Sequence, residues 1–156
     1  MTKIKKFTID QKDLFQTALA IRRKVFVVEQ NVSEEEEFEF EDQCTHFLIY
    51  YKRKAVGTAR HRLTEKGIKL ERFALLKETR GKGVGRDLLR FVLTNARQYQ
   101  KPIYLNAQVA VVDFYKKQGF VINGAKFVEA NIDHYPMIYE NQQNLDKALE
   151  KAICRR

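Results

Sequence analysis

Apolar and polar positions along the chain predict alternating strands and helices. Residues 3–9 alternate charged and apolar side chains, as a half-buried strand does. Asp10 then offers a helix N-cap, with Asp13 in the first turn. Apolar residues follow at helical spacing, namely Leu14, Ala18, Ile21, Val25 and Phe26. The N-terminal region is therefore expected to form a strand followed by a helix.

The middle of the chain predicts an antiparallel meander followed by a βαβ unit. Three runs rich in strand-forming side chains are separated by the polar link KRK and by Gly67: 46–51, 55–63 and 68–75. Between 84 and 100 the apolar residues recur with a 3.6-residue period. Pro102 ends this helix before the apolar strand 103–107.

The C-terminal part predicts a short helix, two strands and an amphipathic tail. The helix covers 111–117 with Gly119 as its cap, the strands cover 120–128 and 134–139, and a last helix is expected within 140–156. Nothing marks a domain boundary, so we expect one domain over 1–156. The order of elements predicts an α+β (mixed α/β) fold, with a central mixed, mostly antiparallel sheet of six to seven strands and helices on both faces.

Composition narrows the class of protein. A chain that is 44% hydrophobic and 31% charged is typical of a soluble globular domain. It has no apolar run of the roughly 18 residues that cross a bilayer, and no signal-peptide core, so we expect a cytoplasmic protein without a membrane partner. Cys44 and Cys154 lie far apart without neighbouring ligands, which predicts neither a disulfide framework nor a metal site.

Charge is unevenly distributed along the chain. The net charge is +9, but residues 34–42 carry seven acids and no base, which leaves 29 basic against 13 acidic residues elsewhere, or +16. A basic body suits a phosphate-rich ligand, either a nucleotide cofactor or a nucleic acid. The acidic run is either a solvated loop or a surface that attracts a cation; the sequence leaves both open.

The glycine-rich stretch RGKGVGR, residues 80–86, predicts a phosphate-binding turn. It lacks the third glycine of a dinucleotide fingerprint, and the chain has no Gly-Lys-Ser/Thr of a P-loop. Its amides would lie at the start of the 84–100 helix, where Arg80, Lys82 and Arg86 add charge-assisted bonds to a pyrophosphate. The alternative is a plain strand-to-helix turn with solvated cations.

Several motifs in order resemble one family. Arg80, Gly83 and Gly85, placed between the strand LERFAL and a helix, resemble the R-x-x-G-x-G of motif A of the GCN5-related N-acetyltransferases (GNAT). IYLNA followed by VVDFYKKQGF resembles motif B. RRKVFVVEQ resembles the R-x-x-V-F-x-x-E-Q opening of a small, poorly characterised bacterial branch. Together the motifs cover nearly the whole chain.

The resemblance implies a reaction and a set of cofactor residues. Acetyl-CoA would be the co-substrate, its acetyl group would pass directly to an amine, and no metal would be needed. Tyr115 would protonate the departing thiolate. The implied cofactor-binding residues are Phe73, Ala74, Leu75, Arg80, Gly81, Lys82, Gly83, Val84, Gly85, Arg86, Asn106 and Phe114. An amide near Phe73 or Ala74 would stabilise the charge that develops on the thioester oxygen.

The general base and the acceptor are less defined. An amine arrives protonated and must lose a proton, and Glu71 is slightly favoured for that task over His134 and Glu129. The resemblance places the acceptor near the first helix, which implies four substrate-binding residues: Arg22, Phe26, Glu29 and Gln30. The adjoining acidic run favours a cationic acceptor, either a small molecule such as a polyamine or amino sugar, or a lysine side chain of a peptide.

Three other functions stay open on the sequence. A longer acyl chain could come from an acyl-CoA or acyl-carrier donor, as in the related acyl-homoserine-lactone synthases. The protein could bind acetyl-CoA without turnover. A nucleic-acid-binding module is disfavoured because the basic residues are spread over all elements and no RNA-recognition, zinc-knuckle or helix-turn-helix signature occurs. The sequence does not choose between a monomer and a homodimer.

Overall fold

The computed structural model describes residues 1–140, which form two compact units, one of residues 1–103 and one that begins at Tyr104. The first unit contains four strands, each antiparallel to the next in chain order. They are β1 (Thr2–Phe7), β2 (Thr45–Tyr51), β3 (Lys54–Thr64) and β4 (Gly67–Leu75). The predicted meander is confirmed.

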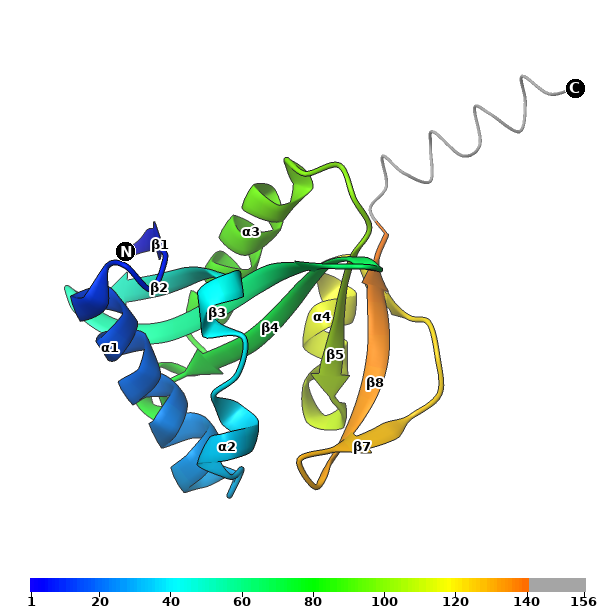
Figure 1. Cartoon of the computed structure of the whole chain (residues 1–156), viewed down its shortest axis with the longest axis horizontal. Helices are drawn as coiled ribbons and strands as arrows, with labels where there is room; N and C mark the ends of the chain where they lie inside the picture. The colour runs from blue at the N-terminus through cyan, green and yellow to red at the C-terminus, as the bar shows by residue number, and fades with distance from the viewer. Residues whose placement is uncertain (141–156) are drawn as a thin grey trace, which may run out of the picture. The chain divides into compact units, whose positions relative to one another are not determined.

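Helices cover both faces of this four-stranded sheet, as Figure 1 shows for α1 and α3. The helical segments of the first unit are α1 (Lys12–Arg22), which continues into the π-helical segment η1 (Arg23–Glu29), α2 (Glu34–Glu37), the 3₁₀ turns η2 (Glu41–Gln43) and η3 (Lys77–Thr79), and α3 (Val84–Arg97).

Successive side chains of β2 pack alternately against the helices on the two faces of the sheet. Leu48 is fully buried in a cluster with Ala18 and Ile21 of α1. Its neighbour Phe47 points to the other face, where its ring lies 5.9 Å from that of Phe91 on α3. Because successive strand side chains point to opposite faces, one apolar strand supplies two cores.

The second unit is organised around its last strand. It contains β5 (Ile103–Gln108), the turn η4 (Val109–Val111), α4 (Val112–Lys117), β6 (Phe120–Ile122), β7 (Phe127–Glu129) and β8 (Ile132–Tyr139). β8 pairs antiparallel with β5, and on its other side with β6 near one end and β7 near the other.

Three predicted details of the elements are corrected by the structure. The residue before α1 is Gln11 instead of Asp10, and its side chain makes no capping bond. The expected strand 120–128 is two short strands, so residues 1–140 contain eight strands against the six to seven expected. Between them the chain bends where Gly124 passes Pro136, so closely that an added Cβ would lie 2.7 Å from its ring.

Two further predictions are confirmed, the acidic run takes a definite structure, and the last predicted helix falls outside the described residues. The α+β class is confirmed, and Gly119, with φ of 102°, ends α4 as predicted. The acidic residues 34–42, hereafter the acidic segment, contain α2 and η2 and are not a plain solvated loop. The expected C-terminal helix falls after Glu140, outside the described residues.

Candidate active site

The glycine-rich turn presents backbone amides at the start of α3. Gly81 and Gly83 both have φ of 80°, and Gly83 is the N-cap. The first bond of the helix runs from the Asp87 N–H to the Gly83 carbonyl at 3.1 Å, so the amides of Val84 and the two residues after it precede the helical ladder. Within residues 1–140, no side chain caps this helix. The turn therefore keeps the geometry of an anion site.

Glycine is required at this turn by its conformation. A Cβ added at Gly81 meets no atom within 4 Å, so space alone would admit a side chain. The left-handed φ is what an L-residue adopts only at a cost of roughly 1 kcal/mol or more. Sequence reasoning had assigned the glycines to close approach of a ligand, and the structure adds the backbone reason.

One cation of the turn is paired with the predicted acceptor side. The Arg80 Nη2 lies 3.0 Å from the Glu29 carboxylate, and its Nε donates to the Leu75 carbonyl at 3.0 Å. Lys82 and Arg86 are exposed. The structure thus brings together Glu29 and Arg80, which the sequence had assigned to different ligands.

The strand expected to hold the thioester contains a β-bulge. Ala59 of β3 lies opposite both Arg72 and Phe73 of β4, where a regular pair would oppose one residue. Arg72 has φ of 57°, a left-handed conformation that is unfavourable for a non-glycine residue. Beyond the bulge, regular pairing resumes with Ala74 opposite Thr58. The side chains after Arg72 are thereby re-aimed.

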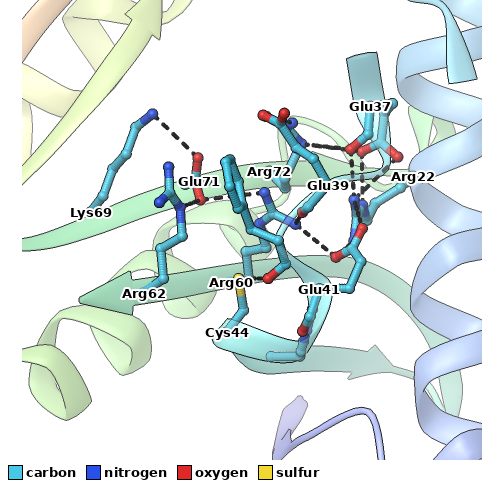
Figure 2. Close-up of polar contacts among 12 residues, drawn as sticks. Arg22, Glu37, Glu39, Glu41, Cys44, Arg60, Arg62, Lys69, Glu71 and Arg72 are labelled. Atoms are coloured by element: carbon cyan, nitrogen blue, oxygen red, sulfur yellow. Dashed lines mark hydrogen bonds and ion pairs between the residues drawn. The ribbon is translucent and has the colours of Figure 1, made fainter. Parts of the chain in front are cut away.

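Glu71, the favoured base, is held by three cations. Its carboxylate lies 2.6 Å from Arg62 Nε and 3.3 Å from both Arg60 Nη2 and Lys69 Nζ (Figure 2). Burial alone raises the pKa of Glu71, but the charges of Arg60, Lys69 and Arg62 outweigh burial, so the pKa lies below its ordinary value of 4.5. A carboxylate stabilised in this way accepts a proton weakly at neutral pH.

Arg22, expected at the acceptor, is buried in the acidic segment. Its side chain is 1% exposed, and its Nε donates to the Glu37 carboxylate at 2.8 Å while Nη2 lies 2.8 Å from that of Glu41 (Figure 2). Glu37 is equally buried. This geometry favours a supporting role for Arg22 over direct contact with a substrate.

The other predicted acceptor residues follow α1 closely. Phe26 lies in η1, packs partly buried against the core cluster, and its carbonyl accepts from the Val32 N–H at 2.9 Å. Gln30 directly follows η1. A π-helical segment widens the helix and re-aims its side chains, and such segments are frequent at functional sites.

Sequence reasoning missed the arginines that organise the acidic segment. Arg60 of β3 is fully buried, with Nη1 2.6 Å from the Glu41 carboxylate, and Arg72 of β4 contacts Glu37 and Glu39. The available signal was seven acids in nine residues, because carboxylates that pack on a domain need buried cations. No periodicity identified which arginines those would be.

In the second unit, Tyr115 lies in an aromatic cluster. Its ring centroid is 5.2 Å from that of Phe114 and 5.8 Å from that of Phe120. Burial raises the pKa of the Tyr115 phenol, so the hydroxyl stays protonated and can donate. Phe114, predicted to contact the cofactor, takes part in this cluster.

His134 and Asn106 lie on paired strands of the same unit. His134 Nδ1 lies 2.7 Å from the Ile132 carbonyl, and its ring stacks on Phe127 at 5.6 Å. Because a carbonyl can only accept, Nδ1 carries the proton and the lone pair of the neutral ring is on Nε2. Asn106 is half-buried on β5 opposite Pro136.

Residues 1–140 contain no group of three or more His, Cys, Asp or Glu side chains placed to hold a metal ion. No helix in this range combines the length and apolar character needed to span a bilayer.

Similarity to known proteins extends over most of the chain. Residues 9–141 match the family described as acetyltransferase (GNAT) domain. The uncharacterized protein YyaT of Bacillus subtilis (strain 168) is 36% identical over 147 residues, covering 91% of this chain and 98% of YyaT. The uncharacterized N-acetyltransferase YjcF of that organism is 37% identical over 130 residues, covering 81% and 93%. The crystal structure of Escherichia coli ElaA matches with a TM-score of 0.78 at 25% identity, covering 90% of this chain and 100% of that chain.

Proposed function

The chain belongs to the GNAT acetyltransferase family, and we propose that it transfers an acetyl group from acetyl-CoA directly to a primary amine. Membership confirms the resemblance to the GNAT family and makes the chain an acyl-CoA N-acyltransferase, while the assignment to the branch with the R-x-x-V-F-x-x-E-Q opening stays a prediction. The observation that carries the finer proposal is the turn at α3, where Gly83 caps the helix without a side chain and exposed cations flank it.

The turn and β4 supply the groups that would bind the cofactor. The amides of Val84, Gly85 and Arg86 suit the pyrophosphate, because the start of a helix combines unpaired donors with a positive dipole end. Lys82 and Arg86 add charge. The backbone of Phe73, Ala74 and Leu75, beyond the bulge, would pair with the pantetheine arm.

The residues then have separate tasks in the transfer. The new C–N bond forms as the C–S bond of the thioester breaks. An amide of Phe73 or Ala74 stabilises the negative charge on the carbonyl oxygen, an effect worth about 3 kcal/mol for one donor. Tyr115 gives its proton to the leaving sulfur; the phenol is available as a donor because it is protonated at neutral pH.

The base that deprotonates the amine is reassigned in this proposal. Glu71 is stabilised as an anion by Arg60, Arg62 and Lys69, so its carboxylate has a low affinity for the proton of the amine. His134 keeps the lone pair of its neutral ring on Nε2 and is the favoured base. Glu129, at the end of β7, remains the third candidate.

The proposed acceptor is a cationic amine: a polyamine, an amino sugar or a lysine side chain. Of the acidic segment, Glu37 is fully buried and Glu41 is paired with Arg22 and Arg60. The exposed acids are Glu34, Glu35, Glu36, Glu39 and Asp42. Glu34 and Glu39 also lie against Arg23 and Arg72, so Glu35, Glu36 and Asp42 contribute most to the surface that would attract a cation.

Calorimetric titration with acetyl-CoA tests the proposal, with NADH and a short RNA as controls in the same buffer. We expect acetyl-CoA alone to bind, and Lys82→Gln together with Arg86→Gln to weaken it. Arg53→Gln, an exposed arginine between β2 and β3, is the matched control and should bind as the parent does. Heat from RNA without heat from acetyl-CoA would contradict the proposal.

Turnover separates the remaining alternatives. Thiol release from acetyl-CoA in the presence of a panel of amines identifies an enzyme, whereas binding without thiol release identifies a sensor. The same assay with butyryl-CoA and octanoyl-CoA measures the preferred acyl length. We expect acetyl-CoA to give the highest kcat/KM.

A further inference from the structure

Arg72 connects the acidic segment to β4, the strand that the proposed function assigns to the thioester. Its Nε donates to the Glu37 carbonyl at 3.1 Å, and its Nη2 donates to the Glu36 carbonyl at 3.1 Å. The guanidinium also lies 3.4 Å from the Glu37 carboxylate and 3.5 Å from that of Glu39 (Figure 2). One side chain thus binds both backbone and carboxylates of the acidic segment.

The acidic segment is fixed on its other side as well. Glu36 and Glu37 end α2, and the last carbonyls of a helix have no partner within the helix. Arg72 satisfies both of them, and Arg22 of α1 donates to the Glu37 carbonyl at 3.0 Å and to its carboxylate. Because Glu37 and Arg22 are both buried, this ion pair is shielded from the solvent that weakens a surface ion pair.

The backbone of Arg72 is where a glycine would be expected. A bulge whose first residue is left-handed usually has glycine there, because any Cβ is unfavourable at that φ. Arg72 adopts φ of 57° all the same, and its side chain is occupied by the acidic segment. The contacts of the guanidinium therefore offset an unfavourable backbone conformation at the bulge.

We propose that Arg72 is a positioning residue. By holding the bulge of β4 against the acidic segment, it sets the direction of the Phe73 and Ala74 amides, one of which stabilises the developing charge. This inference rests on the proposed function. An amide that is misdirected by about 1 Å costs up to roughly 100-fold in rate. The loss appears in kcat, because the interaction strengthens only in the transition state.

The variant Arg72→Gly removes the guanidinium contacts without straining the backbone, because glycine adopts a positive φ freely. The matched control is Arg53→Gly, since Arg53 is exposed and has φ of 67° in the turn between β2 and β3. We expect kcat of Arg72→Gly to fall about 10- to 100-fold with little change in the KM for acetyl-CoA. Added guanidinium ion should restore part of the loss, and Arg53→Gly should match the parent.

Amide hydrogen exchange in the free protein gives a readout that does not depend on activity. In Arg72→Gly, the Phe73 and Ala74 amides should exchange faster, while the Leu48 amide in β2 stays protected. Unchanged kcat and unchanged exchange would overturn the proposal. So would a uniform gain of exchange that includes Leu48, which identifies a general stabiliser. If Arg72→Gly does not fold, Arg72→Lys, which keeps the charge without the fork, is measured in the same way.

Failure of the inference and failure of the proposed function are distinguishable. A parent protein that neither binds nor turns over acetyl-CoA contradicts the proposed function. In that case the exchange of Phe73 and Ala74 alone decides whether Arg72 holds the bulge. A parent that is active, with an equally active Arg72→Gly, contradicts only the inference.

Discussion

At the scale of single residues, the surroundings of a carboxylate decide its chemistry. Glu71 lies on the strand expected to hold the thioester, yet Arg60, Arg62 and Lys69 neutralise it and lower its pKa. A carboxylate that is stabilised in this way is better suited to an ion pair than to the role of general base. His134, with the proton fixed on Nδ1, has the better-defined acceptor atom.

Two of the three candidate bases, His134 and Glu71, differ in the pH dependence that their removal causes. For His134→Gln we expect kcat/KM to fall at neutral pH and to recover as the pH approaches about 10, where the amine loses its own proton. Glu71→Gln should leave the shape of the profile unchanged. A profile of Glu71→Gln that is depressed at neutral pH and recovers at high pH would restore Glu71 as the base.

Tyr115 gives a second prediction at this scale. Replacing it by Phe keeps the ring in its cluster with Phe114 and Phe120 and removes only the donor. We expect kcat to fall about 100-fold, in the range typical of general acid catalysis, with the KM for acetyl-CoA unchanged. Tyr99→Phe, in the exposed turn that follows α3, is the control. Equal kcat in Tyr115→Phe and Tyr99→Phe would exclude the role.

At the scale of elements, ion pairs attach the acidic segment to α1, β3 and β4. Burial raises the pKa of Glu41, but Arg22 and Arg60 outweigh it, so the folded pKa lies below the ordinary 4.5. A carboxyl with a lowered folded pKa stabilises the fold above its unfolded pKa and loses this contribution as pH falls through the folded value. The ion pairs of Glu41 with Arg22 and Arg60 therefore stabilise the fold at neutral pH and lose this contribution in acid.

The prediction for this element concerns stability. Glu41→Gln should lower the free energy of unfolding by about 2 kcal/mol at pH 7, because two buried arginines lose a charged acceptor. The difference from the parent should shrink as the pH falls below the ordinary 4.5, because the unfolded parent takes up a proton first and the folded parent follows only at its lower pKa. Urea titrations at pH 7 and pH 3.5 measure both values. The exposed control Glu35→Gln should match the parent at each pH, and a constant deficit in Glu41→Gln would contradict the ion-pair account.

At the scale of the whole molecule, the proposed function assigns opposite charges to different ligands. The net charge of +9 favours the approach of an anion such as acetyl-CoA, whereas the exposed acids near α2 favour a cation. The assignment of residues 1–156 to one domain remains a prediction.

A prediction follows for the salt dependence of the two substrates. Replacing Glu34, Glu35 and Glu36 together by Gln should raise the KM of a cationic amine several-fold at low salt and leave the KM of acetyl-CoA unchanged. At about 0.5 M NaCl the difference should vanish, because exposed charges are screened. Glu37 is kept, since it is buried and supports Arg22. An amine KM that is insensitive to the triple substitution would contradict a cationic acceptor at this surface.

The sequence by itself determined the local features of the protein. Strand and helix periods predicted β2 to β4, α3 and β8 to within a few residues, because apolar spacing follows the geometry of each element. The glycine turn was readable for the same reason: positive φ at Gly81 and Gly83 is a local requirement. The family followed from motif order.

Only the tertiary structure decided which charges meet. Arg22 and Arg60 lie 38 positions apart in the chain (60 less 22), yet both contact Glu41. A long-range pair of this kind leaves no period in the sequence, so the sequence left the acidic run open as a solvated loop or a cation-attracting surface and gave no sign of the cations around Glu71. The bulge at Arg72 was hidden likewise, because it depends on the register of β4 against β3. Local geometry depends on neighbouring residues in the sequence, whereas ion pairs between distant residues form only when distant segments pack.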